Sequence, residues 1–204
     1  MKKKIGLFII GFTCAFALNA QIKYGLKGSI GLAAGNGTYG NFAITAQSVV
    51  RPSLGLTMDF NGSDKFNWQS GLLINGYGGK YDNENSSTTV SIYTLSIPVF
   101  AKYKISDQVY GFGGPQISFS VYGNAQGSEY DSYTKKTTNS SEDINSHIQK
   151  PMVFGVVGGG YIINDNLTGI AEYNFGINNV ITGEPGAVAK FNCFSLGVIW
   201  NLSK

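Results

Sequence analysis

The stretch from Ser91 to Tyr122 reads SIYTLSIPVFAKYKISDQVYGFGGPQISFSVY and carries the clearest pattern in the chain. Between Tyr93 and Ile105 every odd-numbered residue is apolar or aromatic, whereas most even-numbered residues are polar. A repeat of two residues predicts a β-strand with one apolar and one polar face. This strand exceeds the about 5–6 residues usual in globular proteins and reaches the about 9–11 tilted residues that cross a bilayer.

Three turn-prone residues, Ser106, Asp107 and Gln108, then reverse the chain into a second long strand that begins at Val109. We interpret the pair as a transmembrane β-hairpin whose apolar side faces lipid and whose polar side faces the interior of a barrel. The rest of the chain is expected to complete that barrel.

Residues 1–20, MKKKIGLFIIGFTCAFALNA, have the layout of a secretory signal peptide: a basic start, an apolar run and a small-residue end. The apolar run is shorter than the about 20 residues that a membrane-spanning helix needs. We therefore expect residues 1–20 to be removed and residues 21–204 to form one domain, an outer-membrane β-barrel.

Charge and cysteine content narrow the class of protein further. Lys2, Lys3 and Lys4 account for the whole formal charge of +3, so the predicted domain is neutral and nucleic acid is not an expected partner. Charged residues make up 13% of the chain, against a typical level of about 25%. The two cysteines are Cys14, in the predicted signal peptide, and Cys193, which excludes an intrachain disulfide in the domain.

Alternation of apolar and polar residues predicts further strands on both sides of the opening hairpin. They begin at Ile22 and near Cys193 and otherwise cover residues 50–60, 66–78, 151–163 and 167–177. Polar or glycine-rich stretches over residues 34–48, 80–89, 123–149 and 178–189 are expected to be long loops, and the remaining connections short turns.

Eight strands joined alternately by long and short connections define the predicted fold class. It is all-β: an eight-stranded antiparallel up-and-down transmembrane β-barrel with short periplasmic turns and long extracellular loops, in the outer membrane of a Gram-negative bacterium. A soluble β-sandwich or lipocalin-like barrel would also alternate, but it should carry more charge. Aromatic residues near the strand ends are expected to form interfacial girdles: Tyr24, Phe60, Phe66, Tyr103, Tyr110, Tyr173 and Trp200.

The predicted polar face carries charged residues that should meet inside the barrel. An eight-stranded barrel is just wide enough for its own side chains to fill it, and buried charges need partners. We predict an interior charge network in which Glu172 and Asp59 pair with Lys27, Lys102 or Arg51 as a structural plug. The functional alternative is a narrow gated pore or proton path.

The remaining residues that could carry chemistry are expected to have structural roles or to be solvated. Ser146-His147 lies in a polar loop that would not hold the geometry of a nucleophile and its base, so we expect a solvated histidine. The glycines at 111–114 and 158–160 lack the lysine and the following helix of a phosphate loop, so we expect them to permit close packing. Cys193 is expected to be a small packing residue. The acidic loop residues show no regular ligand spacing. No catalytic, cofactor or metal site is predicted.

Several stretches together resemble the small outer-membrane β-barrel family of PorT type. They are IKYGLKGSIGLA, LSIPVFAKYKI, VYGFGGPQISF, FGVVGGGYIINDNLTGIAEYNFGINNV and FNCFSLGVIWNL, and the likeness spans nearly all of residues 21–202. The resemblance implies an eight-stranded barrel from the bacterial lineage that uses type IX secretion, in which the family's namesake takes part.

These observations lead to one functional expectation and two alternatives. The expectation is a non-enzymatic barrel with a plugged polar interior, embedded in outer-membrane lipid and acting through its loops or wall as a structural or accessory component. Its partners would be other outer-membrane proteins of a secretion or insertion complex. The alternatives are a narrow small-solute channel and a lipid-modifying outer-membrane enzyme.

Overall fold

A computed structural model describes residues 22–39, 42–83, 85–182 and 187–202. The predicted signal peptide, residues 1–20, lies outside these ranges. The described residues form ten strands and one short 3-10 helix, η1: β1 Ile22–Tyr39, β2 Phe42–Thr45, β3 Val49–Asn61, β4 Phe66–Asn83, β5 Ser86–Lys104, β6 Val109–Asp131, β7 Lys136–Asp143, η1 Asn145–His147, β8 Met152–Asn164, β9 Leu167–Gly176 and β10 Ala187–Asn201.

Eight of the strands in the described ranges close into a ring. Each pairs antiparallel with its neighbours in the order β1, β3, β4, β5, β6, β8, β9 and β10. The ring closes where β10 pairs with β1, from Gly25 opposite Asn201 to Tyr39 opposite Ala187. Closure leaves no unpaired sheet edge in the barrel wall, as a lipid environment requires. The predicted fold class is thereby confirmed.

The predicted alternation of faces is also confirmed. Along β9, Thr168, Glu172 and Asn174 are buried inside the barrel, whereas Tyr173 and Phe175 are exposed on its outer wall. Large exposed apolar residues recur on each wall strand, including Leu56, Ile74, Ile97, Phe119, Leu196 and Trp200. This outward apolar surface is the surface that lipid covers.

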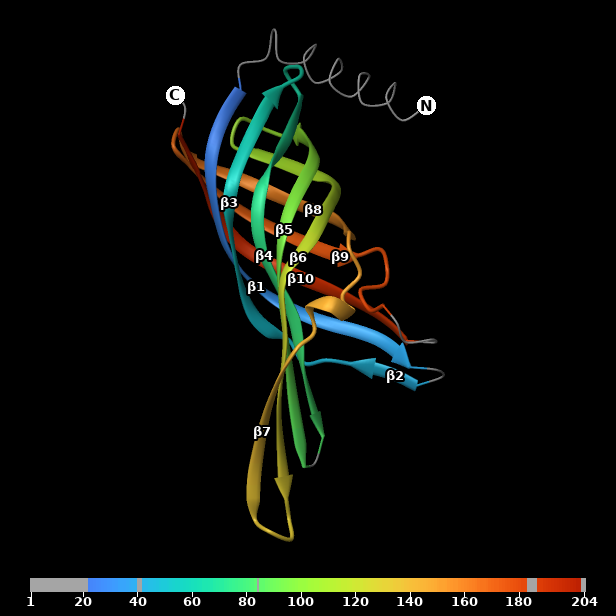
Figure 1. The fold of residues 1–204 in the computed structure, drawn as a ribbon. Coiled ribbons are helices and arrows are strands. Elements are labelled where there is room, and N and C mark those ends of the chain that lie inside the picture. The colour runs from blue at the N-terminus through green and yellow to red at the C-terminus, as the bar shows by residue number, and fades with distance from the viewer. Residues whose placement is uncertain (1–21, 40–41, 84, 183–186, 203–204) are drawn as a thin grey trace, which may run out of the picture.

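The two ends of the barrel differ in their connections (Figure 1). Short turns join β3 to β4, β5 to β6 and β8 to β9 at one end, where β1 also begins and β10 ends. Long strand extensions project from the opposite end. In outer-membrane barrels the short turns are periplasmic, so we call these ends the periplasmic and the outer end.

The prediction of long irregular loops at the outer end needs correction. Residues 80–83 continue β4 and pair with residues 86–89 of β5, and residues 124–131 of β6 pair with β7. β1 likewise extends to Tyr39 and pairs with β2. Beyond the membrane neither face of a strand is buried, so the sequence there loses its two-residue period although the backbone stays paired.

One residue of the predicted aromatic girdles is also placed differently. Tyr24, Phe66, Tyr103 and Trp200 are exposed on the outer wall, and the ring centroids of Phe66 and Tyr103 lie 4.9 Å apart. Tyr110 is instead buried, because its position in β6 faces the interior together with Phe112.

No helix in the described ranges has the length and apolar character needed to span a membrane.

Candidate functional site: the barrel interior and its two mouths

A buried ion pair lies in the barrel interior and joins β1 and β9, the two neighbours of β10. Lys27 on β1 places its Nζ 2.7 Å from both Oε1 and Oε2 of Glu172 on β9. The two side chains are 4% and 5% exposed, and Ser195 Oγ donates a further hydrogen bond of 3.3 Å to Glu172 Oε1. The Glu172 carboxylate therefore has both a counter-charge and a neutral donor, which is what a charge removed from water needs.

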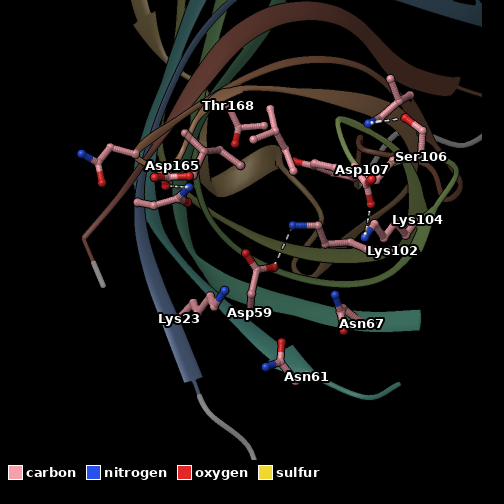
Figure 2. Close-up of a pocket in the computed structure, with 16 residues that line it drawn as sticks. Lys23, Asp59, Asn61, Asn67, Lys102, Lys104, Ser106, Asp107, Asp165 and Thr168 are labelled. Carbon is pink, nitrogen blue, oxygen red and sulfur yellow. Dashed lines mark hydrogen bonds and ion pairs between the residues drawn. The ribbon is translucent and has the colours of Figure 1, made fainter. Parts of the chain in front are cut away.

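A second ion pair lies nearer the periplasmic end. Lys102 on β5 donates from its Nζ to Asp59 Oδ1 on β3 at 3.0 Å, as Figure 2 shows. The same ammonium lies 4.3 Å from the ring centroid of Tyr110, within the range of a cation–π contact. This contact gives the inward-facing ring of Tyr110 a cationic partner.

Arg51 takes no part in either pair. Its guanidinium donates to the main-chain oxygens of Tyr77, at 3.2 Å, and Val90, at 3.0 Å, and to Ser91 Oγ at 2.8 Å. Gly78, next to Tyr77, has a φ of +148°, a conformation that residues with a Cβ rarely adopt. The five residues of the predicted network thus form two separate ion pairs and one cation bound largely to main chain.

The outer half of the interior contains an apolar cluster, which the prediction of a polar interior did not include. Tyr77 and Phe154 stack with ring centroids 4.4 Å apart and an interplanar angle of 7°. Both are almost completely buried, and Gln116 Nε2 donates to the Tyr77 hydroxyl at 2.9 Å. Further buried residues pack around the stack, namely Ala33, Ile92, Ile148, Met152, Val180, Phe191 and Cys193. The burial of Cys193 agrees with its predicted role in packing.

Sequence reasoning missed this apolar region because the strands that build it lack clean alternation. In β8, Phe154, Gly155, Val156 and Val157 follow one another, so the sequence does not show which face is inside. The neighbouring strand β6 does show its inward face in the sequence. Polar residues there recur at every second position from Gln116 onward, and alternate residues of a strand point to the same face.

Hydroxyl groups link neighbouring strands beside the aromatic stack. Thr94 Oγ1 lies 2.9 Å from Ser96 Oγ, which lies 2.8 Å from Ser118 Oγ. Gln116 Nε2 donates to the same Ser118 oxygen at 3.3 Å. These small polar side chains are buried and hydrogen-bonded to one another across β5 and β6.

A polar pocket of about 700 Å³ opens at the periplasmic end (Figure 2). Its lining mixes lysines, aspartates and amides, among them Lys23, Asp59, Lys102 and Asn67. In the turn between β5 and β6, Lys104 Nζ lies 2.8 Å from Asp107 Oδ1, and this hydrogen bond holds the pKa of Asp107 below its ordinary value. Charges of both signs line the pocket, so it has no uniform field for an anion or a cation.

The candidate catalytic residues lie at the outer end. Ser146 Oγ is 3.3 Å from His147 Nδ1 in η1, and both side chains are exposed. Within the described ranges no carboxylate orients the imidazole, so the arrangement that activates a serine is incomplete. The same ranges hold no group of three or more His, Cys, Asp or Glu residues placed to bind a metal.

The glycine run of β8 lies in the barrel wall against aromatic rings. A Cβ at Gly158 would lie 2.5 Å from Phe112 Cζ and 2.6 Å from the main-chain oxygen of Ala171. A Cβ at Gly160 would collide with the ring of Tyr110, whereas a Cβ at Gly159 would make only an ordinary contact, 3.5 Å from the main-chain oxygen of Tyr110. Gly158 and Gly160 therefore permit close packing, as predicted for this run.

A closed antiparallel ring with an apolar outer wall and paired charges inside defines this molecule as a membrane β-barrel of the outer-membrane class. A family model described as "outer membrane protein beta-barrel domain" matches residues 19–182. The chain belongs to this family, and its location is the outer membrane of a Gram-negative bacterium.

The fold is similar to several solved barrels of low sequence identity. Neisserial surface protein A is 12% identical, with a TM-score of 0.47 over 86% of this chain and 96% of that one. The attachment invasion locus protein of Yersinia pestis is 13% identical, with a TM-score of 0.45 over 88% and 98%. OprG of Pseudomonas aeruginosa is 10% identical, with a TM-score of 0.42 over 89% and 96%. A comparison with curated proteins finds no match.

Proposed function

We propose that this protein is a closed, non-enzymatic barrel that acts through its outer strand extensions as an accessory component of an outer-membrane assembly. The observation that carries the first part is the filled cross-section. Tyr77, Phe154 and Met152 are at most 2% exposed, and the Lys27–Glu172 pair is buried in the same interior. Side chains in van der Waals contact and a satisfied ion pair support an interior that is closed to hydrated solutes.

The second part rests on a sheet that continues the barrel wall outward. Residues 80–83 of β4, 86–89 of β5, 126–129 of β6 and 138–141 of β7 pair side by side beyond the barrel. We call this four-stranded extension the outer blade. Figure 1 shows it projecting from the outer end of the barrel. Such a sheet holds a recognition surface more rigidly than an irregular loop does.

The tip of the outer blade presents one aromatic residue entirely to solvent. Tyr133, in the turn between β6 and β7, is 99% exposed. Asp131 accepts hydrogen bonds from the main-chain N–H groups of Tyr133, at 2.8 Å, and Thr134, at 3.3 Å, so the turn itself is ordered. Tyrosines of this kind are frequent energetic centres of protein interfaces. A protein partner at the blade tip is therefore the interaction we favour.

The resemblance to the PorT-type family supplies the kind of assembly: a complex of outer-membrane proteins like that of type IX secretion. β7 offers a second contact in that setting. It pairs only with β6 among the described strands, and such an edge can accept a further strand from a partner.

The test is the size of the native particle. The chain would be extracted from outer membranes in mild detergent and compared with its Tyr133→Ala variant on native gels. We expect a discrete particle well above monomer mass, reduced at least about tenfold in amount by the variant, as loss of a central interface tyrosine implies. The matched control is Ser132→Ala in the same turn, which should leave the particle unchanged.

Three results would overturn parts of the proposal. A monomer-sized particle for the unaltered chain would remove the accessory role, and single-channel steps in a planar bilayer would replace the closed barrel by the small-solute channel. Lipid A spectra that change when the gene is deleted would favour the lipid-modifying enzyme instead.

A further inference from the structure

A second pocket, of about 500 Å³, lies at the outer mouth of the barrel. Its size falls within the about 300–1,000 Å³ of small-molecule sites. The floor consists of buried apolar side chains, Ile92, Ile148, Val180 and Phe191, which belong to the apolar cluster around the Tyr77–Phe154 stack. The pocket thus ends on packed side chains and does not continue through the barrel.

Main-chain hydrogen bonds hold the rim of this pocket in place. Gln149 N donates to Val180 O at 2.7 Å, and Thr182 N donates to His147 O at 2.9 Å. Val180 N in turn donates to Ala189 O on β10 at 2.9 Å. The segments after β7 and after β9 are therefore tied to each other and to the wall, and main-chain hydrogen bonds fix the shape of the rim.

The ionisable groups at the rim include one carboxylate and one imidazole, that of His147. Glu142 is the sole acidic residue among the described lining residues, and these include no lysine or arginine. It forms no ion pair with any described residue. An anion at this mouth would meet an uncompensated carboxylate, whereas a cation would be attracted to it.

Tyr81 adds a hydrogen-bonding group to the lining of the same pocket. Its side chain is half-buried on β4, and its hydroxyl has no hydrogen-bond partner among the described residues. Burial raises the pKa of this phenol, so it stays protonated at neutral pH and can both donate and accept. An apolar cavity with a few convergent polar groups is the usual form of a ligand site.

We propose that the outer-mouth pocket binds a small amphiphile with an apolar body and a protonated amine. The apolar body would occupy the floor over Ile92 and Ile148, and the amine would lie at the rim near Glu142. The pocket shares Tyr81 of β4 with the outer blade, but the proposed partner contact lies at Tyr133, which is not among the lining residues. Loss of the partner contact and loss of ligand binding are therefore distinguishable.

The test uses three water-soluble probes with the same six-carbon chain: hexylamine, hexanol and hexanoate. The chain would be labelled at isoleucine methyl groups, placed in lipid nanodiscs and titrated by NMR. We expect saturable shifts at Ile92 and Ile148, with hexylamine binding about two- to fivefold more tightly than hexanol and hexanoate binding most weakly. The lipid-facing Ile97, 44% exposed, reports partition of the probe into lipid.

Paired variants separate the site from general partitioning. Glu142→Gln should lower the affinity for hexylamine to that of hexanol, whereas Glu129→Gln, the same change on the neighbouring β6, should have no effect. Val90→Phe would narrow the pocket and should abolish the shifts. The methyl spectrum of this variant should still show a folded chain. Shifts that do not saturate, that appear equally at Ile97, or that are as strong with hexanoate would overturn the proposal.

Discussion

Lys27 and Glu172 meet at 2.7 Å although β10 lies between their strands. In the register, Lys27 is opposite Ile199 and Glu172 is opposite Ser195, so the two residues are offset along the sheet. The contact forms because the strands of a closed barrel tilt and the interior is narrow enough for side chains to reach across it.

Removal of one partner should therefore destabilise the barrel strongly. Glu172→Ala leaves the Lys27 ammonium buried without a counter-charge, and we expect the free energy of unfolding to fall by about 3–5 kcal/mol. Chemical unfolding from lipid vesicles, followed by the heat-dependent gel mobility of the folded barrel, would measure this loss.

A double variant separates burial from pairing. Lys27→Met combined with Glu172→Leu removes both charges and should recover most of the lost stability. Asp107→Asn breaks an exposed ion pair with Lys104 and serves as the control, with no measurable change expected. Equal stability of Glu172→Ala and the unaltered chain would contradict the importance of the buried pair.

The aromatic stack makes a separate prediction for the apolar half of the interior. Phe154→Ala would leave a cavity beside Tyr77, and we expect a loss of about 3–5 kcal/mol in the free energy of unfolding. Phe119→Ala on the lipid face, where the side chain is 44% exposed, should cost less because lipid fills the space. The same vesicle-based unfolding measurement applies, and a larger loss for Phe119→Ala would refute the packing argument.

Adjacent glycines in β8 offer a matched pair of variants. Gly158→Ala places a methyl group against Phe112 and the main chain of Ala171, so we expect a loss of about 1–3 kcal/mol from overpacking. The nearest atom to a Cβ at Gly159 would be the main-chain oxygen of Tyr110, at 3.5 Å, so Gly159→Ala should be tolerated. If the two variants have the same unfolding midpoint, the close approach of the rings is not a constraint.

The turn at the blade tip should respond to acid. A hydrogen bond from Thr134 Oγ1, followed by those from the main-chain N–H groups of Tyr133 and Thr134, holds the pKa of Asp131 below its ordinary value. This contribution to turn stability is complete above the ordinary aspartate pKa of about 3.9 and is lost as the pH falls through the lowered one.

The chemical shift of the Tyr133 amide proton reports this titration. We expect a midpoint below about 3.9 and a higher midpoint in Thr134→Val, which lacks the strongest donor. Asp131→Asn should abolish the transition. A midpoint at or above the ordinary value in the unaltered chain would show that the carboxylate is not held in this way.

Alternation alone located the strands of the barrel wall, because lipid on one side and packed side chains on the other impose opposite demands on successive residues. The run from Tyr93 to Ile105 is the clearest case: Leu95, Ile97 and Val99 are exposed on the outer wall, and Thr94 and Ser96 are fully buried. The same signal disappears beyond the membrane, and so the paired strands of the outer blade were predicted as loops.

The sequence by itself determined that residues such as Glu172 and Lys27 lie on inward faces, since their parity along each strand is a local property. The tertiary structure alone decided which inward residues meet, because the tilt of the strands sets the partners across the ring. That is why Glu172 pairs with Lys27 and Asp59 with Lys102, while Arg51 binds main-chain oxygens. The tertiary structure also decided that the Lys102 ammonium lies over the Tyr110 ring inside the barrel. The distance between side chains of β5 and β6 cannot be derived from the local sequence of either strand.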